Sequence, residues 1–350
     1  MRNLRTQEKI IATWNKKYQE PLVSICCITY NHESYIEDAI RGFLEQETEF
    51  PYEILIHDDA STDDTAKIIK DYELKYPNII KAIYQIENQY SKGIRPSIFN
   101  YERAKGKYIA LCEGDDYWTC DDKLRIQIQI HESNPDIKMS FHSAILVNEK
   151  TSFKREIGKY RNDSGIVPVD QIIQKKFGQI PTASTIIQKS AIDSFIDFEK
   201  SNKHLTVGDI YIHFFGAHPN GAFYLNASKS VYRVLTPGSW TETHNNSFSK
   251  RMGHLDSAIN AFESLDNISN RIYSSSLKSA IEKRILSTAI SPQIRINEKL
   301  DIFRKYKNRL SIKNKISLII ITLLPLDFIK KINDVRKKLL LNFKKIFMDS

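Results

Sequence analysis

Short apolar runs that end in polar residues alternate, along the first part of the chain, with stretches in which apolar residues recur every three or four positions. The short runs predict buried strands over residues 22–30, 52–57, 79–84 and 107–112. The recurring residues predict helices, and they are Ile36, Ala39, Ile40, Phe43 and Leu44, then Thr65, Ile68, Ile69, Tyr72 and Tyr76, then Leu124 and Ile128. This alternation predicts an α/β fold, a Rossmann-like, mostly parallel sheet flanked by helices, with a ligand site at the carboxyl ends of its strands.

The periodicity weakens after Phe141, where residues 180–188 and 223–235 look like strands that complete a second, mixed half. Residues 252–310 are helical and polar, and an uncharged run over 316–326 follows. The last predicted helix has an apolar face made of Phe328, Ile332, Val335, Leu339, Phe343 and Ile346. We expect an N-terminal helix (1–20), a main domain (21–245, with halves 21–135 and 136–245), a C-terminal helical extension (246–310) and a basic amphipathic tail (311–350).

The net charge suggests a nucleic-acid partner, but the distribution of the charged residues along the chain argues against one. The 350 residues are 41% hydrophobic and 27% charged, enough for a real core, and the net charge is +9. Residues 311–350 hold nine Lys and Arg against three Asp, so most of the excess lies in the tail. These basic residues alternate with leucine, isoleucine and phenylalanine, which favours a membrane-surface helix over a nucleic-acid groove. We therefore expect no nucleic-acid partner and a peripheral attachment to the inner face of the cell membrane. An ordinary amphipathic helix that packs on the main domain explains the apolar stripe of the tail equally well.

The cysteines and the apolar runs predict a cytoplasmic protein. Cys26, Cys27, Cys112 and Cys120 form no CxxC pair, so neither a disulfide framework nor a zinc site is indicated. The N-terminal residues contain no apolar core of signal-peptide length. No run of about 18 uncharged apolar residues is present, as a membrane-spanning helix would need.

The acidic loop after the fourth predicted strand is the strongest chemical signal. Glu113, Asp115 and Asp116 place three carboxylates within four positions. Like charges this close repel unless a cation neutralises them, and oxygen ligands suit Mg²⁺ or Mn²⁺. On spacing alone, a solvated acidic turn that caps the following helix explains the loop equally well.

A second acidic loop follows the second predicted strand. Ser61, Thr62 or Asp63 is expected to cap the next helix, but Asp58 and Asp59 come too early for that role. A carboxylate at a strand end can accept the imide N–H of a uracil ring. The residues Tyr30 and Asn31 stand at the equivalent place after the first strand.

Three sequence pieces in this order resemble the family 2 glycosyltransferases of GT-A type. The pieces are Thr29-Tyr30-Asn31, the run Asp58-Asp59-Ala60-Ser61-Thr62-Asp63, and residues 106–116 ending in Glu113-Gly114-Asp115-Asp116. They match a strand ending in T-Y-N, a D-D-x-S-x-D motif and a D-x-D-like motif. Glu113 replaces the first aspartate of the last motif, and glutamate can still reach a metal or its water shell.

The resemblance implies roles for these residues. Thr29, Tyr30 and Asn31 would line the nucleoside pocket, and Asp59, helped by Asp58, would bind the nucleobase. Asp115 would be the direct ligand of Mn²⁺ or Mg²⁺, with Glu113 beside it. The half 21–135 would then bind the nucleotide and the half 136–245 the acceptor.

The resemblance continues more faintly to about residue 245. Thr182 falls in a segment that would border the acceptor, on the same side as Asp116 and Trp118. Asp209 matches the position of the catalytic carboxylate, although from the residues alone a helix cap explains it better. Residues 232–235 resemble a terminal Y-R-x-H element in which Leu235 replaces the histidine. His244 is a possible substitute, but a lone histidine in a polar loop is more often simply solvated.

The implied activity is metal-dependent, inverting transfer of a hexose or N-acetylhexosamine from a nucleoside diphosphate sugar, with uridine as the expected base. The acceptor would be the hydroxyl of a glycan, and by analogy with bacterial surface-polysaccharide enzymes a lipid-linked one. A sugar-nucleotide pyrophosphorylase would need a glycine-rich, basic loop after the first strand, which is absent from the sequence there. A catalytically inactive carbohydrate-binding or scaffold protein is the other alternative, and the intact carboxylates argue against it.

Overall fold

The computed structural model describes residues 4–202, 208–234, 247–291 and 293–323. The chain divides into two compact units, Met1–Thr243 and His244–Ser350. Within the described ranges, every helix is too short or too polar to cross a membrane.

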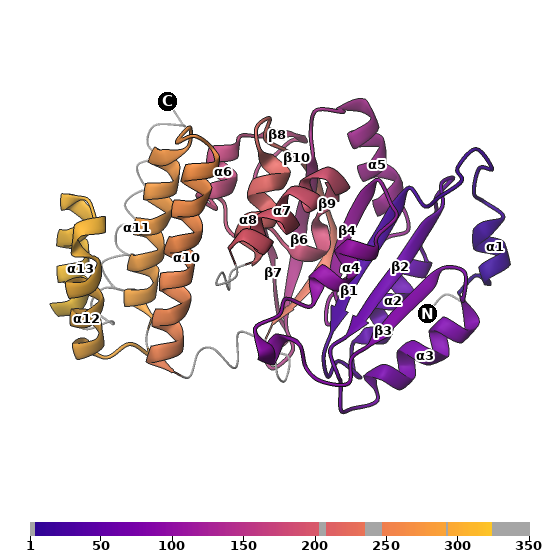
Figure 1. Cartoon of the computed structure of the whole chain (residues 1–350), viewed down its shortest axis with the longest axis horizontal. Helices are drawn as coiled ribbons and strands as arrows, with labels where there is room; N and C mark the ends of the chain where they lie inside the picture. The colour runs from indigo at the N-terminus through magenta and orange to yellow at the C-terminus, as the bar shows by residue number, and fades with distance from the viewer. Residues whose placement is uncertain (1–3, 203–207, 235–246, 292, 324–350) are drawn as a thin grey trace, which may run out of the picture. The chain divides into compact units, whose positions relative to one another are not determined.

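A single mixed sheet forms the centre of the first unit (Figure 1). Its strand order is β3-β2-β1-β4-β9-β6-β10-β5, with β7 paired to β6 and β8 paired to β10. The strands are β1 (Val23–Thr29), β2 (Tyr52–Asp58), β3 (Ile80–Tyr84), β4 (Tyr108–Glu113), β5 (Tyr117–Trp118), β6 (Met139–Asn148), β7 (Phe153–Ile157), β8 (Gly165–Val167), β9 (Ile186–Gln188) and β10 (Ala222–Val234). Neighbours in the β3-β2-β1-β4 part are parallel, as are β6 and β10. The predicted α/β fold with a mostly parallel sheet is confirmed.

Helices flank this sheet, and three of them, α2, α3 and α5, lie where the apolar stripes predict them. They are α1 (Gln7–Ile11), α2 (Ile36–Leu44), α3 (Thr65–Lys75), α4 (Ser97–Arg103), α5 (Lys123–Ser133), α6 (Val169–Ile173), α7 (Lys189–Ser201) and α8 (Gly208–Ala217). The stripe of α2 is buried throughout, because its apolar residues lie on one face of the helix and pack into the core. In α3 the predicted stripe is buried at Ile69 and Tyr72, and Tyr76 ends the helix.

The second half of the main domain continues the sheet of the first half. β9 pairs antiparallel with β4 on one side and with β6 on the other, so the sheet runs on without a break. The strand predicted over residues 180–188 is shorter, because Thr182–Ser184 form a 3-10 turn. The Ser184 hydroxyl closes this turn by donating to the Pro181 carbonyl at 2.6 Å.

A buried amide on α4 connects the two strands at the centre of the parallel part. Asn100 is fully buried, and its Nδ2 donates to the carbonyl oxygens of Cys27 in β1 at 2.8 Å and Leu55 in β2 at 3.0 Å. A buried amide with both donors paired fixes the two strands relative to the helix.

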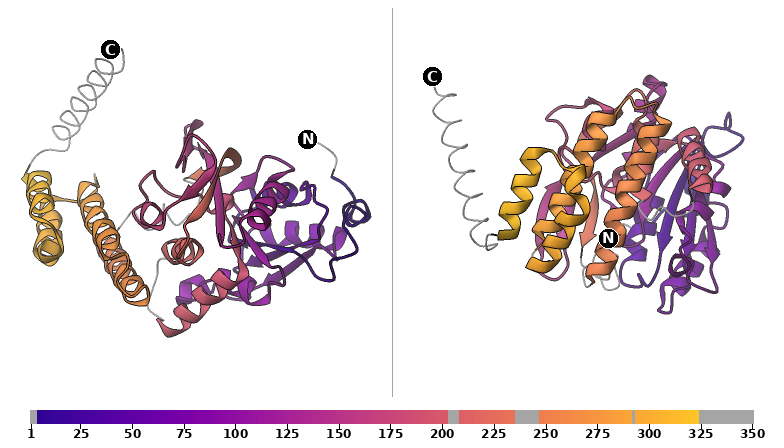
Figure 2. Two further views of the ribbon diagram at one scale, coloured as in Figure 1. Left: turned by 90° about the horizontal axis from the view of Figure 1, so that it is seen from above. Right: turned by 60° about the vertical axis from the view of Figure 1, so that its left-hand side comes forward.

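The second unit contains, in its described part, four α-helices, which are drawn in orange to yellow in Figure 2. They are α10 (Phe248–Ile268), α11 (Ser274–Ile290), α12 (Ile296–Tyr306) and α13 (Ile312–Leu323). The α13 residues Leu318 and Ile321 are buried against α11 and α12, and Lys299 Nζ donates to the Ile321 carbonyl at 3.2 Å. The helix expected over residues 328–346 lies outside the described residues.

A buried lysine supports the short strand β5. Lys123 opens α5 with no exposed surface, and its Nζ lies 4.4 Å from the centre of the Trp118 ring. Among the described residues its ammonium has no hydrogen-bond partner. Burial lowers the pKa of Lys123 from 10.5 to about 7, because the charged form loses its hydration.

This lysine makes stability depend on pH. Above pH 7 the unfolded chain binds a proton at Lys123 that the folded protein releases, so the free energy of unfolding rises with pH up to about 10.5. The slope from this one group is at most about 1.4 kcal/mol per pH unit. Urea unfolding of wild type and of Lys123→Met across pH 6 to about 10 should show that the variant lacks this rise. The exposed Lys67→Met variant should keep it, and a Lys123→Met curve parallel to wild type would contradict the assignment.

Candidate functional site

The carboxyl ends of β1, β2 and β4 lie next to one another. Thr29 at the end of β1 is in register with Asp58 at the end of β2, and Ile28 is in register with Glu113 at the end of β4. The three motifs found in the sequence therefore meet at one edge of the sheet, because parallel strands end together.

The loops after β1 and β2 are cross-braced by side-chain hydrogen bonds. Asn31 adopts a left-handed backbone conformation (φ 55°), and its Oδ1 accepts from the Thr62 amide at 2.8 Å while its own amide donates to Ser61 Oγ at 2.9 Å. Glu33 Oε2 accepts from the Asp64 amide at 3.0 Å. Asparagine tolerates the left-handed region better than most residues, so the sequence fits this geometry.

Asp58 and Asp59 are both buried, at 2% and 3% exposure. Asp59 accepts from the amides of Gln89 at 2.8 Å and Tyr90 at 3.1 Å, and so holds the segment after β3 against the site. Asp58 accepts from the Ser61 hydroxyl, and burial raises the pKa of the Asp58 carboxyl. A carboxylate has about four lone-pair directions, so the two amides leave Asp59 further capacity to accept.

The acidic loop concentrates negative charge in a poorly solvated place. Burial, the charge of Asp115 and that of Asp209 raise the pKa of Glu113 to about 8. The pKa of Asp116 is also raised, by burial and by Asp115 and Glu113. Asp116 Oδ1 accepts from the Arg233 amide at 2.9 Å, whereas its buried Oδ2 has no hydrogen-bond partner among the described residues. This charge suits a bound cation, although no three His, Cys, Asp or Glu side chains in the described ranges are arranged to hold one unaided.

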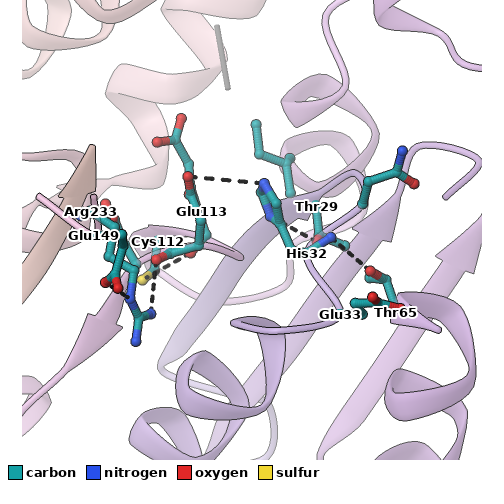
Figure 3. Close-up of polar contacts among 12 residues, drawn as sticks. Thr29, His32, Glu33, Thr65, Cys112, Glu113, Glu149 and Arg233 are labelled. Atoms are coloured by element: carbon teal, nitrogen blue, oxygen red, sulfur yellow. Dashed lines mark hydrogen bonds and ion pairs between the residues drawn. The ribbon is translucent and has the colours of Figure 1, made fainter. Parts of the chain in front are cut away.

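His32 joins the β1 loop to the acidic loop, and the sequence patterns gave it no role. Figure 3 shows His32 beside Thr29 on the side that faces Glu113. Its Nδ1 lies 3.1 Å from Thr29 Oγ1, and its Nε2 lies 4.0 Å from Asp115 Oδ2. A Cβ atom at Gly114 would come within 2.6 Å of Thr29 Oγ1 and 3.0 Å of His32 Nδ1, so only glycine allows this close packing.

Arg233 at the end of β10 holds the acidic loop from the other side (Figure 3). Its guanidinium donates to the backbone carbonyl of Asp115 at 3.0 Å and forms ion pairs with Asp38 on α2 at 2.6 Å and Glu149 at 3.0 Å. The Tyr117 ring centre lies 4.5 Å from its Cζ. The charge of Arg233 is thus shared with Asp38 and Glu149, while the loop is held mainly through its backbone.

The residues expected on the acceptor side differ in how exposed they are to solvent. Trp118 is only 3% exposed, and its Nε1 donates to the Ala183 carbonyl at 2.8 Å, so it supports the turn that carries the half-buried Thr182. Asp116 is fully buried. Asp209 is exposed in the first turn of α8, close enough for its charge to raise the pKa of Glu113. Leu235 and His244 lie outside the described residues.

Part of the chain is similar in sequence to known proteins. Residues 24–193 match the family model "Glycosyl transferase family 2". An uncharacterised protein of Mycobacterium tuberculosis is 33% identical over 237 residues, which are 66% of this chain and 65% of that protein. The chain therefore spans slightly less than two thirds of that relative's length.

Two further proteins are similar over different extents. The UDP-Glc:alpha-D-GlcNAc-diphosphoundecaprenol beta-1,3-glucosyltransferase WfaP of Escherichia coli is 40% identical over 111 residues, 31% of this chain and 40% of that protein. The crystal structure of Staphylococcus aureus TarS residues 1–349 with UDP-GlcNAc superposes with a TM-score of 0.52 at 15% identity, over 85% of this chain and 90% of that one. The TarS likeness shows a shared fold.

The arrangement around Arg233 predicts a specific effect of its replacement. Lysine keeps the positive charge but cannot contact Asp38, Glu149 and the Asp115 carbonyl at once. Arg233→Lys should lower the free energy of unfolding by about 1–3 kcal/mol and raise amide hydrogen exchange over residues 113–118.

Lys229 provides the matched control on the same strand, where it pairs with Asp122 at 2.6 Å. Lys229→Met should leave exchange at residues 113–118 unchanged. Equal protection of that segment in wild type and Arg233→Lys would show that Arg233 does not hold the loop.

Proposed function

We propose that this protein, whose residues 24–193 match the model of glycosyltransferase family 2, moves a hexose or N-acetylhexosamine from a UDP-sugar to an acceptor hydroxyl. The observation that carries the proposal is the buried carboxylate cluster at the joined ends of β1, β2 and β4. Such a cluster disfavours its own negative charge and so favours a divalent ion together with a diphosphate.

The nucleoside would bind between the loops that follow β1 and β2. Tyr30 is 40% exposed and offers a ring face for the base, next to the cross-braced Asn31 and the buried Thr29. Asp59, with Asp58 beside it, would accept the imide N–H of uracil. The cross-bracing supports this role because fixed loops lose little entropy when a ligand binds.

The diphosphate would lie over the acidic loop, where Asp115 would hold Mn²⁺ or Mg²⁺ and Glu113 would reach the ion or its water shell. Protein sites commonly hold such ions through one or two carboxylates, with substrate phosphate oxygens and water completing the shell. When bound, the ion supplies Lewis-acid stabilisation of the departing diphosphate. Asp116 Oδ2, which is buried without a hydrogen-bond partner among the described residues, is a further oxygen of this loop.

Asp209 would remove the proton from the acceptor hydroxyl. The hydroxyl oxygen then bonds to the anomeric carbon as the bond from that carbon to the diphosphate oxygen breaks, and one such displacement inverts the anomeric centre. The exposure of Asp209 at the start of α8 leaves it accessible to an acceptor, unlike the buried Asp116. Trp118 would act indirectly, by holding the turn with Thr182 on the acceptor side.

We assign the acceptor to the class of lipid-linked glycans, for which α13 offers support. Its apolar residues Ile312, Ile316, Ile319, Ile320 and Leu323 are exposed along one face, at 42–79%. Exposed apolar stripes followed by paired basic residues are typical of helices that lie on anionic membranes. The protein would then work at the inner face of the cell membrane. WfaP, by its name, acts on a diphosphoundecaprenol-linked sugar, so a related acceptor is consistent with this assignment.

Two variants separate chemistry from metal-dependent binding. Asp209→Asn should lower kcat by about 10² to 10⁴-fold while leaving the Kd for UDP with Mn²⁺ nearly unchanged. Asp115→Asn should weaken UDP binding in Mn²⁺ and abolish turnover. The assay is UDP release from a panel of UDP-sugars with a GlcNAc-diphosphoundecaprenol acceptor, with and without chelator.

Asp193→Asn on α7 is the control for these variants, since within the described ranges Asp193 forms an ion pair with Lys189 alone, in an i,i+4 contact. It should behave as wild type. Normal turnover by Asp209→Asn would contradict the role of Asp209 as the general base. Full activity in excess chelator would contradict the metal dependence of the reaction.

The tail predicts measurable vesicle binding. Each lysine near an anionic surface contributes about 1 kcal/mol, and the seven Lys and Arg beyond residue 323 should give salt-sensitive attachment. A cut after Leu310 would remove α13 with its buried Leu318, so the truncation belongs after Leu323. The full chain should co-sediment with anionic vesicles, bind less at high salt and ignore neutral vesicles, and the truncated chain should lose most of this binding. Equal sedimentation of both chains would place the attachment elsewhere, and no sedimentation of the full chain would end the membrane proposal.

A further inference from the structure

His32 is held in place where the β1 loop meets the acidic loop. Its backbone amide donates to Thr65 Oγ1 at 2.8 Å, and its Nδ1 lies 3.1 Å from Thr29 Oγ1. The ring lies next to Gly114, where a Cβ atom would come within 3.0 Å of Nδ1. The side chains of His32 and Asp115 are only 14% and 15% exposed.

The second ring nitrogen faces Asp115 at a distance that suits a shared ion. His32 Nε2 and Asp115 Oδ2 are 4.0 Å apart, which is too far for a direct hydrogen bond. Two ligands that each lie roughly 2.0 to 2.2 Å from one divalent ion are separated by about 3 to 4.3 Å, depending on the angle at the ion. With Nδ1–H donated to Thr29 Oγ1, Nε2 would present its lone pair toward Asp115, as in histidine ligands whose other nitrogen is held by a neighbour.

We propose that His32 Nε2 is a ligand of the divalent ion, beside Asp115. The inference rests on the proposed function, because it concerns the same ion. It adds a nitrogen donor from the end of β1 to a site otherwise made of carboxylates.

If His32 is a nitrogen ligand, it should change the relative affinity of the site for different metal ions, whereas a purely structural histidine should not. Imidazole binds Co²⁺ more strongly than Mg²⁺, whereas carboxylate and water suit Mg²⁺. The ratio of Co²⁺ to Mg²⁺ affinity therefore reports the ligand, while a general loosening of the loop would weaken both ions alike.

The test measures metal binding directly, in the full chain with UDP present. Free Mn²⁺ is followed by its electron paramagnetic resonance signal, and Co²⁺ and Mg²⁺ compete with it. His32→Ala should weaken Mn²⁺ binding by about tenfold to a hundredfold. His32→Asp, which replaces nitrogen with oxygen, should keep Mg²⁺ binding and lose the preference for Co²⁺.

His57→Gln is the matched control. His57 lies buried in β2, and its Nε2 is 3.4 Å from Asp59 Oδ1, which makes it a similar histidine and carboxylate pair one strand away. This variant should leave the Co²⁺ to Mg²⁺ ratio unchanged even if UDP binds more weakly.

The outcomes separate this inference from the proposed function. If Asp115→Asn abolishes Mn²⁺ binding while His32→Ala and His32→Asp keep the wild-type affinity and ratio, only the His32 assignment is wrong. If wild type fails to bind Mn²⁺ with UDP, or Asp115→Asn binds it normally, the metal site of the proposed function fails and the His32 ligand with it.

Discussion

Mutual repulsion among Glu113, Asp115 and Asp116 is the constraint around which the site is arranged. Burial strengthens this repulsion, and the raised pKa values of Glu113 and Asp116 show that surrounding groups do not offset it fully. The loop is nevertheless held in place, because Arg233 donates a hydrogen bond to its backbone and Gly114 allows it to pack on the β1 loop. A site held in this way disfavours the charged forms of its carboxyl groups, and a divalent ion with a nucleotide diphosphate would stabilise them.

The parallel part of the fold could be predicted from the sequence because its signals are local. Apolar runs and helical stripes fix β1, α2, β2 and α3 nearly to the residue, and parallel strands must end at one edge. The meeting of Thr29, Asp58 and Glu113 follows from that rule and from the register of the strands. The position of the acidic residues near Asp115 at this edge could be predicted for the same reason, because they follow the end of β4.

The remaining parts of the fold and the site could not be predicted, because they depend on contacts between residues far apart in the sequence or on polar residues that are buried. β6 carries Ser140, His142 and Ser143, which are polar yet fully buried, so its sequence lacks the apolar pattern of a strand. The contact between Arg233 and Asp38 joins residues 195 positions apart, and no local sequence pattern predicts it. His32 follows the T-Y-N piece directly, but its approach to Asp115 depends on how two loops pack.

The most direct test of the account is a crystal structure of the full chain with UDP and Mn²⁺, in which anomalous scattering locates the ion. The account predicts an anomalous peak beside the Asp115 carboxylate, in contact with the diphosphate, and uracil between the loops that follow β1 and β2. Density for UDP at another part of the surface, or UDP bound at this edge with no ion near Asp115, would contradict it.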